Sequence, residues 1–123
     1  MDDRPLLEGV TVLVLASVGP AARAARWLAD WGATVVEVGP IPRDRDLQIT
    51  PPAHAYAAHR GMRRLMVDLQ AENGREAFLR LATKADVVIE SFRPGVVDRL
   101  GVGYEAVRVL NPGIVYCSTT GYG

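Results

Sequence analysis

The chain has 123 residues, of which 49% are hydrophobic and 23% charged, and its 14 basic side chains balance its 14 acidic ones. This composition is ordinary for one folded domain and argues against disorder. The neutral balance gives no support for nucleic-acid binding, which needs a clear basic excess, and no apolar run approaches the roughly 18 residues that span a membrane.

The first predicted elements form a strand–helix–strand unit. Residues 10–15, VTVLVL, are a continuous run rich in β-branched residues, which predicts a strand covered on both faces. Pro20 is a good first helical residue, and Gly32 stands in the usual position that ends a helix. Residues 34–38 predict a second buried strand. Ala24, Leu28 and Trp31 fall on one face of the helix.

The rest of the chain continues this alternation. Residues 39–52 hold four prolines and predict a loop, and a short helix is expected within 54–62. Gly74 weakens the helix that contains it by about 1 kcal/mol relative to alanine. That helix is expected to bury Phe78, Leu81 and Ala82. The further predicted strands are 65–69, 86–89 and 114–118, and the helices are 71–83, a short one ending at 100, and 104–110.

Strands that alternate with helices at this spacing predict an α/β fold, a parallel Rossmann-like sheet with helices on both faces. The strand at 10–15 is expected at its centre, in the order 3-2-1-4-5. The side chains expected to be buried are Val12, Leu13, Val35, Val36, Val87 and Ile89.

In such a sheet, ligands bind beyond the carboxyl ends of the strands, where the strand order reverses. This crevice would lie between the first and fourth strands, lined by residues 16–20 and 91–95. The first loop leads into a helix whose free N–H groups and partial positive charge favour an anion such as phosphate. A tight strand–helix turn without a ligand explains the Gly-Pro pair equally well.

A dinucleotide-binding domain is the competing interpretation. Glu37 ends the second strand, where such domains keep a ribose-binding acid, but the three-glycine phosphate fingerprint is missing. The basic cluster at 59–64 is either a phosphate contact or a solvated strand entrance. Its place before the third strand puts it away from the crevice, unless the ligand is long enough to reach both.

Other chemistry finds little support. His54 and His59 are the only histidines and make no metal pattern. Cys117 cannot form an internal disulfide, which favours a reducing, cytoplasmic setting, and its apolar surroundings predict a buried structural thiol. No signal peptide is evident. A surface or capping role is expected for the strand-flanking carboxylates of Asp68, Asp86 and Glu90.

Several stretches carry a family resemblance. PLLEGVTVL at 5–13, LADWGATVVEV at 28–38 and HRGMRR at 59–64 come first, and ADVVIESFRPG at 85–95 and NPGIVYCS at 111–118 follow. In order and spacing this series resembles the amino-terminal part of the family III CoA-transferases, which include formyl-CoA transferases and α-methylacyl-CoA racemases.

The resemblance implies that residues 1–123 are an amino-terminal CoA-binding α/β domain, incomplete relative to the family. The implied activity is transfer of CoA between an acyl-CoA and a carboxylic acid, or acyl-CoA racemisation, in a homodimer without a metal. Many members have asparagine where this chain has Ser91. The implied CoA contacts are Val18, Gly19, Pro20, Arg63, Ser91, Phe92, Arg99 and Leu100.

The family's catalytic residues lie beyond position 123, so the resemblance implies no catalytic residue in this chain. We therefore expect it to be inactive alone and to need a carboxyl-terminal half on the same or a second chain. The alternatives are a non-catalytic CoA-binding or structural subunit, and a truncated reading frame. The expected partners are acyl-CoA and a carboxylic acid, with neither nucleic acid nor membrane.

Overall fold

The computed structural model describes residues 2–16, 19–41 and 60–121. The predicted alternation of strands and helices is confirmed there, with bounds that differ by a few residues. The expected short helix within 54–62 lies mostly outside the described residues. In chain order the elements are β1 Thr11–Leu15, α1 Gly19–Asp30, β2 Thr34–Gly39, β3 Arg63–Met66, α2 Glu72–Ala82, β4 Val87–Glu90, α3 Val96–Arg99, α4 Tyr104–Leu110 and β5 Val115–Ser118.

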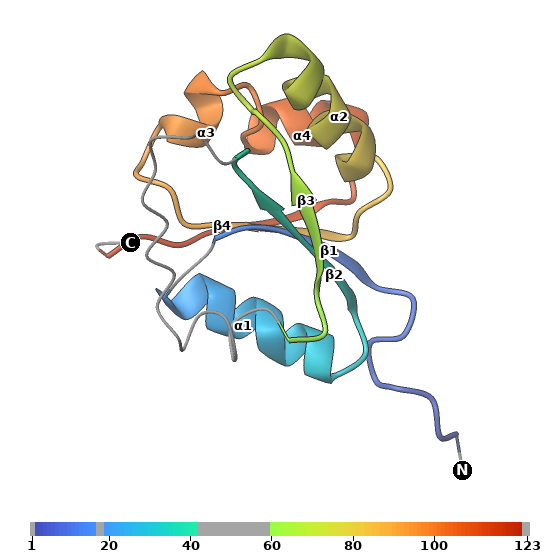
Figure 1. Cartoon of the computed structure of the whole chain (residues 1–123). Coiled ribbons are helices and arrows are strands. Elements are labelled where there is room, and N and C mark those ends of the chain that lie inside the picture. The colour runs from blue at the N-terminus through green and yellow to red at the C-terminus, as the bar shows by residue number, and fades with distance from the viewer. Residues whose placement is uncertain (1, 17–18, 42–59, 122–123) are drawn as a thin grey trace.

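The strands form one parallel sheet in the order β3-β2-β1-β4-β5, which confirms the predicted order and the central place of β1. Helix α1 covers one face of the sheet, and α2, α3 and α4 cover the other (Figure 1). The fold is therefore the expected Rossmann-like α/β arrangement, with helices on both faces.

Strand β1 supplies side chains to both cores, because successive residues of a strand point to opposite faces. Leu13 and Leu15 pack in the cluster beneath α2, α3 and α4, whereas Val12 and Val14 pack in the cluster beneath α1. Of the six side chains expected to be buried, four are buried and the other two, Val36 and Val87, are half-buried.

The face of α1 that carries Ala24, Leu28 and Trp31 is buried only in part, since Leu28 packs against the core beneath α1 while the other two are exposed. The helix buries Ala21, Ala22 and Ala25, while Ala24 is exposed and Trp31 is 51% exposed. Small alanine side chains let the helix lie close against the sheet, which leaves the bulky side chains for the outer surface. Trp27 and Trp31 contact each other there, with ring centroids 6.4 Å apart.

Helix α2 buries Phe78 and Ala82 as predicted, but Leu81 is 37% exposed and Gly74 takes the third buried place. Strand β3 begins two residues earlier than expected. It is an edge strand of the described sheet, and charged side chains such as Arg63 are well tolerated on such a strand.

Cys117 is exposed, so the prediction of a buried thiol was wrong. It pairs with Ile89 in the register of β4 and β5, which places it on the α1 face of the sheet. Helix α1 contacts β1, β2 and β4, and Val115 on the same face of β5 is 60% exposed. Whether the side chains of β5 are buried therefore depends on which elements cover that strand. The apolar run in the sequence does not reveal this.

Candidate functional site

The carboxyl ends of the parallel strands meet at one edge of the sheet. At this edge β1 leads into α1 on one face, while β4 leads into α3 on the other face (Figure 1). Since β1 and β4 are neighbours, their two connections diverge from adjacent strand ends. This is the switch point at which doubly wound sheets bind ligands, as the sequence predicted.

The loop after β1 begins at the buried Ala16 and enters α1 at Gly19, whose φ is 82°. Gly19 and Pro20 are both exposed, and Val18, predicted to contact CoA, lies outside the described residues. The first turn of α1 carries no acidic side chain. The partial positive charge of this helix start is therefore not neutralised by a carboxylate in its own first turn.

The turn after β4 presents Ser91 to solvent and anchors Phe92. Ser91 is exposed, whereas the half-buried ring of Phe92 packs against the core beneath α2, α3 and α4. The N–H of Phe92 donates a hydrogen bond of 2.9 Å to Oε2 of Glu90. The turn is thus held both by the ring of Phe92 and by the backbone N–H of Phe92.

Glu90 itself is 4% exposed, so it is not a surface residue, but its carboxylate accepts a backbone N–H and thus has the capping role that was the other expectation. Its register partner Leu15 belongs to the core beneath α2, α3 and α4, which places the carboxylate on that face. For Asp68 and Asp86 the expectation is confirmed, because each accepts a hydrogen bond from a backbone N–H near the surface, that of Gln70 and that of Thr11 respectively.

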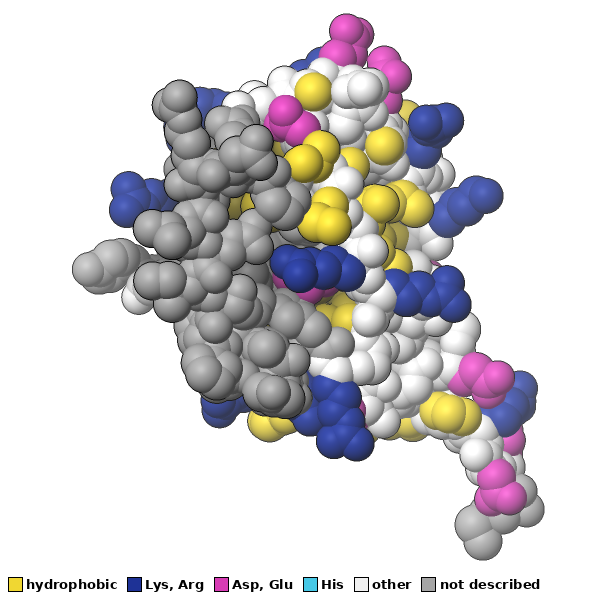
Figure 2. Space-filling model, in the orientation of Figure 1, with side chains coloured by type: hydrophobic (Ala, Val, Ile, Leu, Met, Phe, Trp, Pro, Cys, Tyr) yellow, Lys and Arg dark blue, Asp and Glu magenta, His cyan; other side chains and the backbone are white. Residues whose placement is uncertain are grey.

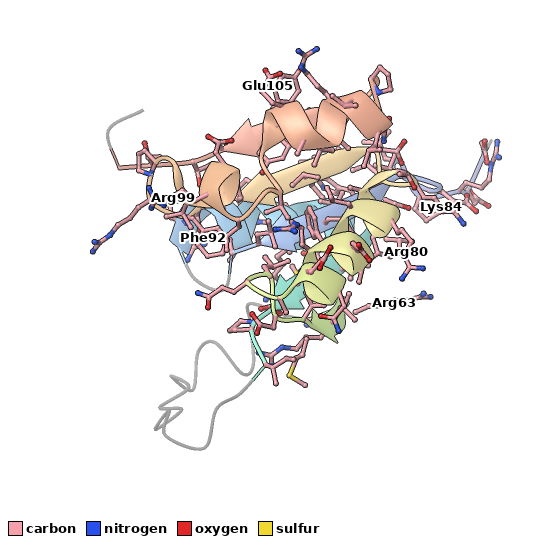
Figure 3. All side chains as sticks on the ribbon, turned by 90° about the horizontal axis from the view of Figure 1, so that it is seen from above. Arg63, Arg80, Lys84, Phe92, Arg99 and Glu105 are labelled. Atoms are coloured by element: carbon pink, nitrogen blue, oxygen red, sulfur yellow. The ribbon has the colours of Figure 1, made fainter. Side chains whose placement is uncertain are left out.

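Helix α3 follows the same turn. It ends at Arg99, and Leu100 comes directly after it. Arg99 is exposed, and its guanidinium lies beside Gly95, where a β-carbon would come within 3.3 Å of Nη1. Leu100 is half-buried against the core. Figure 3 shows Phe92 and Arg99 on the same side of the molecule, so the structure brings these two predicted contacts together.

Arg63 lies apart from them. It is exposed on β3 and pairs with Val36, three strands away from β4 in the sheet order. At about 4.8 Å per strand, this separates it from β4 by roughly 14 Å. In Figure 3 it lies on the opposite side from Phe92 and Arg99, near Arg80 and Lys84.

A buried carboxylate and a half-buried hydroxyl of the sheet each have a polar partner. The carboxylate of Glu37, where a dinucleotide domain keeps its ribose-binding acid, forms an ion pair of 3.9 Å with Arg64 of the next strand. The hydroxyl of Tyr116 donates a hydrogen bond of 2.9 Å to the carbonyl of Val102. Burial, and then the negative charges of Glu90 and Asp98, hold the pKa of Tyr116 above its usual range.

The described residues hold no group of three or more side chains suited to a metal ion, and both histidines lie outside them. No helix within the described ranges is long and apolar enough to cross a membrane. On the face drawn in Figure 2, the Lys and Arg side chains that are coloured are spread over the surface and do not gather in one patch.

Comparison with known proteins identifies close relatives. Residues 7–123 match the sequence model of CoA-transferase family III. The succinate–glutarate CoA-transferase of Agrobacterium fabrum is 36% identical over 133 residues, covering 98% of this chain and 33% of that protein. Acetyl-CoA:oxalate CoA-transferase of Acetobacter aceti is 33% identical over 122 residues, covering 94% of this chain and 31% of that protein.

The same relationship appears among solved structures. The crystal structure of Rv3272 from Mycobacterium tuberculosis matches this chain with a TM-score of 0.89 and 36% sequence identity. The match covers 98% of this chain and 34% of that one. The chain therefore spans about a third of the length of the relatives that it matches.

Proposed function

Because this chain belongs to CoA-transferase family III, we propose that it provides the acyl-CoA-binding part of an enzyme that transfers CoA between an acyl-CoA and a carboxylic acid. The observation that carries the proposal is the family match along residues 7–123. The two relatives described above are both CoA-transferases, which favours transfer over the racemisation that the sequence left open.

The proposed CoA site is the carboxyl edge between β1 and β4. Gly19 and Pro20 at the start of α1 would face phosphate, because the helix start carries free N–H groups and partial positive charge. Arg99 would supply a charged hydrogen bond. Contacts at Ser91, Phe92 and Leu100, together with Val18, complete the proposed set. Arg63 belongs to it only if the ligand extends across the sheet to β3.

In the proposed reaction, a carboxylate attacks the thioester carbonyl of the acyl-CoA, and the CoA thiolate leaves as an enzyme-bound anhydride forms. The thiolate then attacks the enzyme's own carbonyl and releases the first acyl group as a carboxylate, which leaves CoA bound as an enzyme thioester. We propose that the attacking carboxylate comes from outside these 123 residues. Glu90 is poorly suited to this role, because it is buried and accepts a backbone hydrogen bond.

Titration calorimetry of the 123-residue chain with CoA and with NAD tests the proposal. We expect measurable CoA binding and weaker or no NAD binding, because the edge offers a helix start and arginines but no dinucleotide glycines. Binding of NAD without measurable CoA affinity would contradict the proposal.

Two arginine variants sharpen the test. Arg99→Ala should weaken CoA binding by about tenfold or more, as expected for a lost charged hydrogen bond. Arg108→Ala is the matched control, because Arg108 is an exposed arginine of α4 that pairs with Glu105 at 2.6 Å. Equal losses in both variants would show a non-specific charge effect. A loss of CoA affinity in Arg63→Ala would show separately that the ligand reaches β3.

A further inference from the structure

Glu90 and Glu37 are the charged side chains that are buried among the described residues. A carboxylate is costly to bury unless hydrogen bonds or opposite charges compensate it. Glu37 lies 3.9 Å from the guanidinium of Arg64, whereas Glu90 accepts a hydrogen bond from the chain that follows it. The carboxylate of Glu90 is buried and bonds to the turn at the proposed CoA site, which indicates a role in that site.

The position of Glu90 joins two segments at the carboxyl edge. Its carboxylate accepts the N–H of Phe92, two residues ahead, at 2.9 Å. Its backbone carbonyl accepts the N–H of Thr119 at 2.9 Å and the Thr119 hydroxyl at 3.3 Å. The chain that leaves β4 and the chain that leaves β5 are therefore both fastened to this one residue.

The hydrogen bond from the Phe92 N–H restricts the turn next to the exposed Ser91. The ring of Phe92 is fixed in the core, and its N–H is fixed by the carboxylate, so the peptide between Ser91 and Phe92 has little freedom to rotate. Ser91 is then presented outward on a backbone of set orientation. A binding group that is held in place before its ligand arrives loses less entropy on binding.

We propose that Glu90 is a positioning residue, whose carboxylate holds the Ser91–Phe92 peptide in the orientation that binds CoA. The inference rests on the proposed function, because it assumes that this turn contacts CoA. Glu90 acts through the Phe92 N–H and does not touch the ligand.

Strand β4 offers a matched control at its other end. Asp86, directly before β4, also accepts a backbone hydrogen bond, from the N–H of Thr11 at 2.8 Å. Each bond joins a carboxylate at one end of β4 to a backbone N–H. Asp86, however, lies at the amino-terminal edge of the sheet, away from the site. Loss of the Asp86 bond should therefore lower stability without altering CoA affinity.

The experiment compares the 123-residue chain with Glu90→Ala, Glu90→Gln, Glu90→Leu and Asp86→Ala, using CoA titration and thermal melting. Glu90→Ala should weaken CoA binding about tenfold, the effect of one lost positioning hydrogen bond. Glu90→Gln keeps an acceptor oxygen of the same reach and should retain the affinity of the original chain. Asp86→Ala should melt earlier and bind CoA normally. If Glu90→Ala does not fold, Glu90→Leu decides, because leucine fills the buried position but offers no acceptor to the Phe92 N–H.

Hydrogen exchange gives a readout that does not need the ligand. The Phe92 amide should exchange faster in Glu90→Ala than in the original chain, and should be unchanged in Asp86→Ala. Unaltered CoA affinity in a folded Glu90→Ala or Glu90→Leu variant would overturn the inference while leaving the proposed function intact. A chain that binds no CoA in its original form would overturn both.

Discussion

Gly74, in the first turns of α2, packs directly against the backbone carbonyl of Asp68. A β-carbon at position 74 would overlap with the oxygen and carbon of that carbonyl. The same carbonyl accepts the N–H of Ala71 at 3.1 Å, so the turn before the helix is closely fitted to it. The glycine that weakens the helix on propensity alone is therefore required by tertiary contact.

Overpacking typically costs roughly 1–3 kcal/mol and the gain in helix propensity is about 1 kcal/mol, so Gly74→Ala is expected to destabilise the chain by up to about 2 kcal/mol. Urea denaturation measures the free energy of unfolding. The neighbouring Asn73→Ala is the control, since Asn73 is exposed in the same helix and should become slightly more stable on propensity grounds. A stabilised Gly74→Ala variant would contradict the packing described here.

Because of Tyr116, we expect the folded chain to lose stability in alkaline solution. Its folded-state pKa lies above the usual value, chiefly because the half-buried side chain is partly removed from water. An unfolded tyrosine ionises near pH 10, so above about that pH the unfolded chain binds fewer protons than the folded one. The free energy of unfolding must then fall as the pH rises.

Denaturation series from about pH 9 to about pH 11 test this, with Tyr116→Phe as the comparison. The variant loses the hydrogen bond to Val102 and should be less stable by about 1 kcal/mol near neutral pH. Its stability should nevertheless decline less steeply with pH, because phenylalanine does not ionise. Parallel curves for the two proteins would show that Tyr116 does not contribute to the alkaline loss.

The exposed apolar face of β5 predicts self-association. Val115 is 60% exposed on a strand at the edge of the described sheet, and Cys117 on the same face is also exposed. Uncovered edge strands favour pairing with other chains, and charge on them opposes it. Sedimentation velocity should show concentration-dependent association that Val115→Lys reduces.

Val109→Lys is the matched control for this surface. Val109 is 75% exposed but lies on α4, which covers the opposite face of the sheet (Figure 1). The same charge placed there should leave association unchanged. A monodisperse monomer of the original chain, or an equal effect of both lysines, would count against β5 as the associating surface.

The 123-residue chain alone is expected to form no acyl-enzyme. Incubation with an acyl-CoA and a carboxylic acid, followed by trapping with hydroxylamine and mass spectrometry, should give no hydroxamate on this chain. A full-length relative, treated identically, serves as the positive control. A hydroxamate on any residue here, with Asp98 and Glu90 examined first, would refute the expectation that the attacking carboxylate lies elsewhere.

The sequence by itself determined the order of elements, the parallel sheet and the edge that carries the candidate site. These follow from signals between near neighbours in the chain, such as the β-branched run in β1. Gly32 is another, and ends α1 with a φ of 102° as predicted. Because parallel strands must end at a common edge, the loops after β1 and β4 could be placed together before any coordinate was known.

Tertiary structure decided which side chains are buried and which contacts meet. The alanines of α1 lie against the sheet while Trp27 and Trp31 face outward, a choice that the apolar residues around the helix left open. Glu90 became a buried acceptor for the N–H of Phe92. Each outcome depends on elements distant in sequence that pack against the residue in question, and no local pattern encodes that packing.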